Sequence, residues 1–185
     1  MTEKKTGTLG SMVKTVVTLL LFAAVVAALL GLVNQVTAGP IAEHQTAKTQ
    51  SAMKSVLPAS GYSQVIYEGD PLVKAVYKAE DQGWVIEVTP SGFGGLIDML
   101  VGVDPSGSVT GVSIVSMSET SGLGANAARE SFRSQYAGKS GSVKLRKQGG
   151  EIDALTGATV TSTAVTNGVN AALAAAGELM KEGGL

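Results

Sequence analysis

The sequence predicts an α+β protein in which one N-terminal transmembrane helix precedes a single extracytoplasmic domain with an antiparallel sheet flanked by helices. Three observations support this fold class: an uncharged apolar segment at 15–33, paired strand-like segments between 73 and 117, and an alanine-rich helical pattern at the end. Consecutive strands with helices at both ends indicate α+β and not alternating βαβ units. A chain of 185 residues has room for one modest domain and an anchor.

The apolar segment 15–33 is predicted to cross a membrane. Its nineteen residues carry no charge, and a helix needs roughly 20 apolar residues to span the hydrocarbon core. Three lysines precede the segment and no basic residue follows it until Lys48. The positive-inside rule therefore places residues 1–14 in the cytoplasm and the rest of the chain on the extracytoplasmic side of the cell membrane. A cleaved signal peptide is the alternative, because Val36–Ala38 resembles a cleavage site, although the apolar run is longer than a usual signal core.

Residues 34–58 are predicted to form a linker helix, and residues 59–185 the folded domain. Pro40 suits the first turn of such a helix, a weakly amphipathic pattern follows it, and Pro58 lies beyond its end. The linker helix either continues from the anchor or bends away from it at Gly39–Pro40.

Two β-hairpins are predicted in the domain. The first joins residues 73–79 to 83–89 through the polar EDQ, and the second joins 96–104 to 108–117 through PSG. Turn residues between short apolar segments are typical of hairpins. The two hairpins together predict an antiparallel sheet with one face toward a core.

Three further elements are expected after the hairpins. Residues 124–138 predict a short helix ended by Gly138, and residues 142–147 predict a strand. A long helix is expected from about Ser162 to Lys181. Apolar residues recur along one side of it at helical spacing, namely Val165, Val169, Leu173, Ala176 and Met180.

The composition excludes several classes of site. Cysteine is absent, which rules out disulfides, thiol catalysis and cysteine-ligated metals. The single histidine, His44, lies in a polar stretch where a surface role is expected. The net charge is −1 with scattered basic residues, so we expect neither a metal centre nor a nucleic-acid surface.

Two glycine-rich stretches could line a ligand site. SGFGGLID at 91–98 lacks the context of a dinucleotide fingerprint, since a strand and not a helix follows it, and a glycine-permitted bend is the alternative. SETSGLGAN at 118–126 follows an apolar strand, where its glycines would let the backbone approach a flat ligand closely. A plain strand-to-helix connection explains this second stretch as well.

The stretch DALTGAT at 153–159 opens a run of hydroxyl side chains. The run offers five hydroxyls within eight residues directly before a predicted helix. A helix N-terminus attracts phosphate through its unpaired N–H groups and partial positive charge. Capping the helix needs only one hydroxyl, so the run suggests a phosphate held close to, or covalently on, one of them. The hydroxyls belong to Thr156, Thr159, Thr161, Ser162 and Thr163.

The pattern D-x-x-T-G-A-T resembles the flavinylation motif of the FMN-binding domain family, which is found in the G subunit of the Rnf electron transport complex and in the C subunit of the sodium-pumping NADH:quinone oxidoreductase. PIAEHQ…VLP, the G-aromatic-x-G strand entry, GVDPSGSVTGV and ETSGLG extend the resemblance along nearly the whole chain. The chain departs from the family in two places, since Ser121 and Leu96 each stand where a proline is usual. Its short length resembles the Rnf protein more than the longer quinone oxidoreductase protein.

The resemblance implies that a flavin transferase uses FAD to place FMN, through a phosphoester, on Thr159. Asp153 would serve recognition by that transferase or orient a metal for it. Small or hydroxyl residues would shape the phosphate site, and the two glycine-rich stretches would contribute the rest of the cofactor site. The residues implied are Gly157, Ala158 and Thr161 at the phosphate, Glu119, Thr120, Gly122 and Leu123 near the ring, and Phe93 and Gly94.

The function implied is that of an electron-transfer subunit in an ion-translocating membrane complex of the Rnf type, a ferredoxin:NAD⁺ oxidoreductase. Its partners would be the membrane and redox subunits of the complex, the transferase during maturation, and membrane lipid. By itself the chain would turn over no substrate. The alternatives are a stand-alone exported flavoprotein, and a non-redox anchored binding module whose threonines only cap a helix.

Overall fold

The computed structural model describes the backbone of residues 6–181, and the side chains of these residues except 6–9, 38–46 and 81. The chain divides into two compact units, residues 1–47 and 48–185. The predicted cytoplasmic segment 1–14 thus lies partly outside the described residues, as does the side chain of His44.

Helix α1 (Thr6–Val56) contains the anchor. Its segment Gly10–Thr37 is long and apolar enough to cross a membrane, and its described side chains are exposed. The linker predicted as a helix is helical without a break as far as Val56. Of the two alternatives left by the sequence, the linker helix therefore continues from the anchor, and Pro40 lies inside α1 and not in a first turn; there it donates no backbone hydrogen bond.

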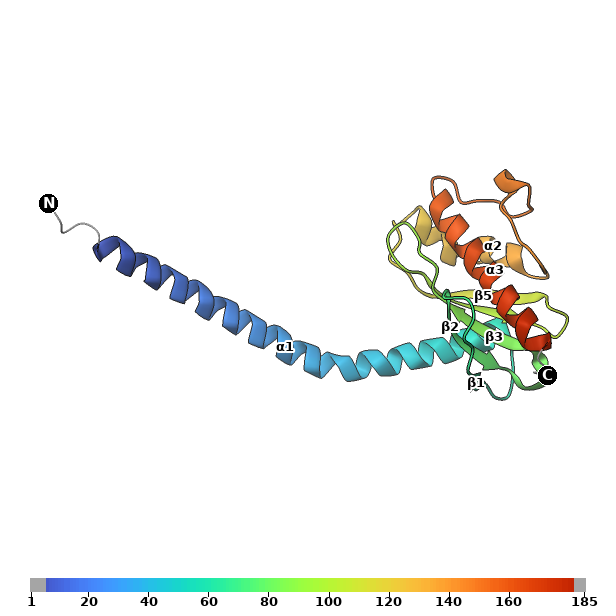
Figure 1. Ribbon diagram of the computed structural model, residues 1–185, viewed down its shortest axis with the longest axis horizontal. Helices are drawn as coiled ribbons and strands as arrows, with labels where there is room; N and C mark the ends of the chain where they lie inside the picture. The colour runs from blue at the N-terminus through green and yellow to red at the C-terminus, as the bar shows by residue number, and fades with distance from the viewer. Residues whose placement is uncertain (1–5, 182–185) are drawn as a thin grey trace. The chain divides into compact units, whose positions relative to one another are not determined.

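The second unit is built on a five-stranded antiparallel sheet with the strand order β1-β2-β3-β4-β5, visible in green to yellow in Figure 1. Each strand pairs with the next along the chain, so the sheet is a simple meander and the predicted α+β class is confirmed. Both predicted hairpins form, and the short edge strand β1 is an addition that was not predicted from the sequence. The strands are β1 (Ser63–Val65), β2 (Val73–Lys78), β3 (Trp84–Val88), β4 (Asp98–Val103) and β5 (Val109–Ser116).

Helix α3 (Thr159–Lys181) covers one face of the sheet. Alternation along β3 turns Ile86 and Val88 toward α3 and Val85 to the opposite face. The predicted apolar stripe of α3 lies in this core, with only Met180 partly exposed. Burial of this stripe against the sheet therefore contributes to the apolar stabilisation of the unit.

The end of α1, within the second unit, covers the other face of the sheet. Val56 packs there against a pair of opposed glycines, Gly102 on β4 and Gly111 on β5. A Cβ atom on Gly102 would lie 2.6 Å from the Val56 carbonyl oxygen, so only glycine permits this approach. The Thr110 hydroxyl donates a hydrogen bond of 2.5 Å to the same oxygen.

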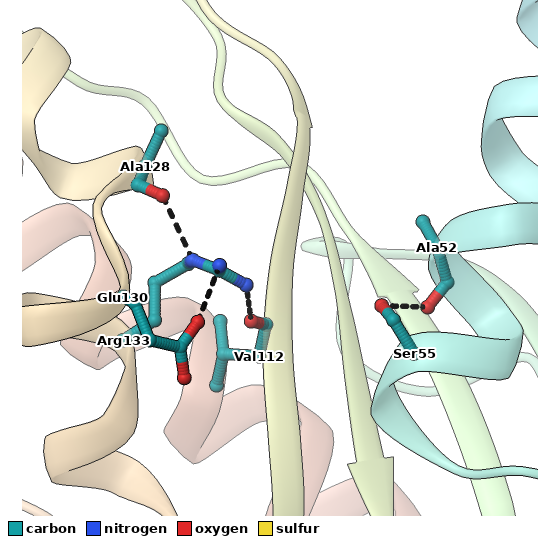
Figure 2. A network of polar contacts seen from close by, with 6 residues as sticks. All are labelled: Ala52, Ser55, Val112, Ala128, Glu130 and Arg133. Atoms are coloured by element: carbon teal, nitrogen blue, oxygen red, sulfur yellow. Dashed lines mark hydrogen bonds and ion pairs between the residues drawn. The ribbon is translucent and has the colours of Figure 1, made fainter.

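The helix predicted at 124–138 is broken into three short pieces. These are the 3₁₀ helix η2 (Gly124–Ala128), helix α2 (Glu130–Arg133) and the 3₁₀ helix η3 (Ser134–Tyr136). The break lies at Arg129, whose backbone is extended. Figure 2 shows the guanidinium of Arg133 donating to the carbonyl oxygens of Ala128 (2.9 Å) and Val112 (2.6 Å), which ties these pieces to β5.

The strand predicted at 142–147 is wrong. The segment has buried Val143 and Leu145 but makes only an isolated parallel bridge between Leu145 and Ile152, followed by the 3₁₀ helix η4 (Arg146–Gln148). Within the described residues it pairs with no strand of the sheet, and at the start of β5 it is Gly138 and Lys139 that exchange backbone hydrogen bonds with Val109. Apolar alternation alone therefore misidentified a buried loop as a strand.

Candidate functional site

A cavity of about 400 Å³ lies where three distant segments of the second unit meet. The segments are the loop between β3 and β4, the turn that follows β5, and the start of α3. The lining residues are Phe93, Glu119, Thr120, Leu123, Gly124, Gly157, Ala158, Thr159, Val160 and Thr161. Eight of the ten residues predicted for the cofactor site therefore line one cavity.

Gly94 and Gly122, the other two predicted residues, lie in the same loops but do not line the cavity. The structure adds Gly124 and Val160 to the wall. Gly124 belongs to the glycine-rich stretch at 118–126, which was identified from the sequence as a candidate part of a ligand site. Val160 directly follows the stretch DALTGAT at 153–159. An apolar residue in the first turn of the helix, next to that stretch, was the sequence signal that could have identified it as a cavity residue.

The cavity has apolar walls that are open to solvent. Phe93 is 73% exposed, Leu123 43% and Val160 54%. Of the large apolar side chains described as exposed outside α1, only Ile66 and Leu96 do not line this cavity. Single exposed apolar residues are ordinary, but a cluster in a cavity marks a binding surface.

Helix α3 begins at Thr159, three residues earlier than the sequence predicted. A tight turn precedes it, in which the Ala158 amide donates to the Leu155 carbonyl oxygen at 3.0 Å and Gly157 has φ +74°. Glycine adopts this left-handed conformation without strain. The first-turn amides of an α-helix have no partner within the helix, so those of Thr159 and Val160, two residues that line the cavity, have no intrahelical acceptor.

Three of the five hydroxyls in the run make hydrogen bonds to other groups of the protein. Ser162 is fully buried; its Oγ accepts from the Leu155 amide and donates to the Ala158 carbonyl oxygen, both at 2.9 Å. Thr161 Oγ1 donates to Glu119 Oε2 at 2.8 Å, and Thr163 Oγ1 donates to the Thr159 carbonyl oxygen at 2.9 Å.

Thr156 and Thr159 are the two exposed hydroxyls of the run. Within the described part of the chain, neither side chain makes a hydrogen bond. Thr159 lines the cavity and Thr156 does not. Burial and position together leave Thr159 as the one threonine of the run that combines a free hydroxyl with access to the cavity.

A second depression, of about 420 Å³, adjoins the cavity, since Gly157 and Thr159 line both. Asp153 lines it and is held from two directions. The side-chain amide of Gln135 accepts a hydrogen bond from the Asp153 backbone N–H at 2.7 Å and donates one to the Asp153 carbonyl oxygen at 3.3 Å. From the other direction, Arg146 Nε donates to the Asp153 carboxylate at 2.7 Å. The start of the motif is thus ordered, with its acid exposed at the surface.

Comparisons with known proteins agree with this geometry. Residues 92–174 match the family described as the FMN-binding domain, and residues 1–56 match the RnfG N-terminal region. The first match contains every residue that lines the cavity, and the second covers the whole of α1.

Curated relatives carry related names. The chain is 34% identical to the G subunit of the ion-translocating oxidoreductase complex of Methanosarcina acetivorans, over 86% of this chain and 92% of the relative. Its identity to the corresponding G subunit of Escherichia coli K12 is also 34%, over 84% and 86% of the two chains. The G subunit of the proton-translocating ferredoxin:NAD⁺ oxidoreductase complex of Clostridium ljungdahlii is 47% identical, but over only 49% of this chain and 51% of the relative.

A solved structure has a similar fold. The crystal structure of the C subunit of the Na⁺-translocating NADH-quinone reductase from Parabacteroides distasonis aligns with a TM-score of 0.53 at 20% identity, covering 72% of this chain and 83% of that one. At this identity the likeness concerns the fold alone.

Proposed function

The chain belongs to the family of G subunits of ion-translocating oxidoreductase complexes, and on this premise we propose that it is a membrane-anchored electron-transfer protein carrying FMN covalently on Thr159. The complex is of the ferredoxin:NAD⁺ oxidoreductase type named for its relatives. The protein turns over no substrate by itself and passes electrons between partner centres.

One observation carries the covalent part of the proposal. The Thr159 hydroxyl is exposed, makes no hydrogen bond with another described residue, and stands at the edge of an apolar cavity at the start of a helix. An acceptor hydroxyl must be reachable by the modifying enzyme, and the attached group needs an adjacent site to occupy. Thr159 meets both requirements.

The residues around Thr159 suit FMN. The cavity volume lies within the roughly 300–1,000 Å³ typical of small-molecule sites. Phe93, Leu123 and Val160 offer apolar surface to a flat ring, and the first-turn amides of α3 suit a phosphate. FMN, once bound, supplies electron transfer, while the protein positions it and adjusts its potential.

The second depression is the side from which we expect the flavin transferase to approach. It presents the Asp153 carboxylate together with the Thr159 hydroxyl. In the transfer, Thr159 Oγ forms a bond to the FMN phosphorus of FAD, the pyrophosphate bond breaks, AMP leaves, and the hydroxyl proton passes to a base of the transferase.

We place the cofactor domain on the extracytoplasmic side. Helix α1 supplies the single candidate span within the described residues, and the lysines at positions 4, 5 and 14 favour a cytoplasmic N-terminus. Protease added to right-side-out vesicles should cleave at Arg129, which is exposed. Protection of Arg129 from the protease would contradict this orientation and indicate that the domain lies on the cytoplasmic side.

The deciding experiment is intact-mass and peptide analysis of the protein extracted from native membranes. We expect a mass increase of one FMN less one water, located on the peptide that contains Thr159. An unmodified chain, or a modification on another residue, contradicts the covalent assignment. Co-purification with integral membrane subunits separates a complex component from a stand-alone exported flavoprotein.

A further inference from the structure

We propose that Glu119 is a positioning residue that joins two walls of the cavity, the loop between β3 and β4 and the first turn of α3, and places a fixed negative charge beside the bound flavin. The inference rests on the proposed function only for its second half, because the joint between the walls belongs to the protein itself.

Three donors from two separate segments converge on the Glu119 carboxylate. Oε1 accepts the backbone N–H groups of Phe93 (2.8 Å) and Gly94 (3.0 Å), and Oε2 accepts the Thr161 hydroxyl (2.8 Å). Phe93 belongs to one wall, whereas Thr161 lies in the first turn of α3 on the other. Charge-assisted hydrogen bonds of this length are among the stronger ones in proteins, so Glu119 sets the separation of the walls.

The neighbouring glycines are spaced for this carboxylate. A Cβ atom on Gly92 would collide with Glu119 Oε1, and one on Gly124 would collide with Oε2. The Gly124 Cβ would also lie 2.7 Å from the Thr161 hydroxyl. Two of the glycines in the glycine-rich stretches, Gly92 and Gly124, therefore make room for the Glu119 side chain.

The charge of Glu119 is balanced by dipoles and not by a cation. In the described residues, no lysine or arginine forms an ion pair with it. A carboxylate that lines the cavity opposes the addition of electrons to a flavin held there, because reduction adds negative charge nearby. Glu119 thus lowers the reduction potential of the bound group.

Two substitutions separate geometry from charge. Glu119→Gln keeps the shape: its amide oxygen still accepts from the two backbone N–H groups, and its NH₂ group can donate to the Thr161 hydroxyl. Glu119→Ala removes both the joint and the charge. Glu68→Gln removes an exposed carboxylate that lies outside the cavity and serves as the matched control.

The first measurement is amide hydrogen exchange across residues 92–96 in the full chain without flavin. Losing the acceptor should speed exchange of the Phe93 and Gly94 amides by about tenfold or more in Glu119→Ala, with rates near wild type in Glu119→Gln and Glu68→Gln. Unchanged exchange rates in Glu119→Ala would contradict the proposal that Glu119 joins the two walls of the cavity. This result stands whether or not the protein carries flavin.

The second measurement is the midpoint potential of the flavinylated protein in each variant. Glu119→Gln should shift the potential to a more positive value, and Glu68→Gln should leave it at the wild-type value. Equal potentials in the Glu119→Gln variant and the wild type overturn the role of the charge. Absence of flavin from the wild-type protein would contradict the proposed function instead. The exchange experiment would still show whether Glu119 joins the two walls of the cavity.

Discussion

The two halves of helix α3 perform different tasks although they form one continuous helix. The C-terminal half, from Val169 onward, carries most of the apolar stripe that begins at Val165 and packs against the sheet. The N-terminal half, Thr159–Thr166, is rich in hydroxyls, of which Thr161, Ser162 and Thr166 are buried and hydrogen-bonded. Only the first residue of this half presents a free hydroxyl beside the cavity.

The difference shows how a reactive position can be carried on a stable element. The apolar half provides the burial that holds the helix on the sheet. The buried hydroxyls then orient the first turn through specific hydrogen bonds. Thr159 therefore contributes little to stability and is available for modification.

The largest expected effect comes from breaking the apolar half. Val169→Asp places an unpaired charge at a fully buried position and should destabilise the second unit by more than about 4 kcal/mol. Trp84, the only tryptophan, is buried in the same core, so thermal melting followed by its fluorescence reports this change. A melting temperature near that of wild type would contradict the assignment of the core.

The next effect concerns Ser162, which supports the turn before α3. Ser162→Ala leaves the Leu155 amide without its acceptor and should cost about 1–3 kcal/mol. Because this turn presents Thr159, flavin attachment should also become slower. In-gel flavin fluorescence during a time course of maturation measures this rate, and unaltered stability together with an unaltered rate would count against the role of Ser162.

Tyr136 provides a smaller effect with a distinctive pH dependence. Burial raises the pKa of Tyr136 from 10.0 to about 12, against the lowering effect of its hydrogen bond with Thr166. The contribution of this neutral phenol is present below pH 10, where the unfolded side chain is also neutral, and is lost as the pH rises from about 10 to about 12.

Tyr136→Phe should cost about 0.5–1.5 kcal/mol at neutral pH through the lost hydrogen bond. Its unfolding free energy should then fall less steeply than that of wild type above pH 10. Parallel pH profiles for the two proteins would show that Tyr136 ionises equally well in the folded state.

The smallest expected effect on stability accompanies the largest effect on the cofactor. Thr159→Ala removes an exposed hydroxyl and should change stability by less than about 1 kcal/mol, yet abolish in-gel flavin fluorescence. Thr156→Ala removes the other exposed hydroxyl of the run and should keep the flavin. The reverse result would move the attachment site to Thr156.

Sequence patterns predicted the local elements well where spacing is decisive. The two hairpins and the apolar stripe of α3 follow from periods of about 2 and 3.6 residues, and the structure confirms them. The same reasoning failed at residues 142–147, where the strand-like alternation belongs to a loop that buries Val143 and Leu145 without pairing with a described strand of the sheet. It also failed at 124–138, where the extended backbone of Arg129 breaks the helix.

By itself, the sequence determined the apolar membrane-spanning segment, the two hairpins and the presence of a hydroxyl-rich motif before a helix, because each depends on neighbours along the chain. It named five chemically equal hydroxyls without showing which was free. Only the tertiary structure decided that Ser162 and Thr161 are engaged and that Thr159 faces the cavity. The reason is that hydrogen bonds join residues far apart in sequence: Thr161 and Glu119 are 42 positions apart, and no local pattern records which groups folding will bring within 3 Å of one another.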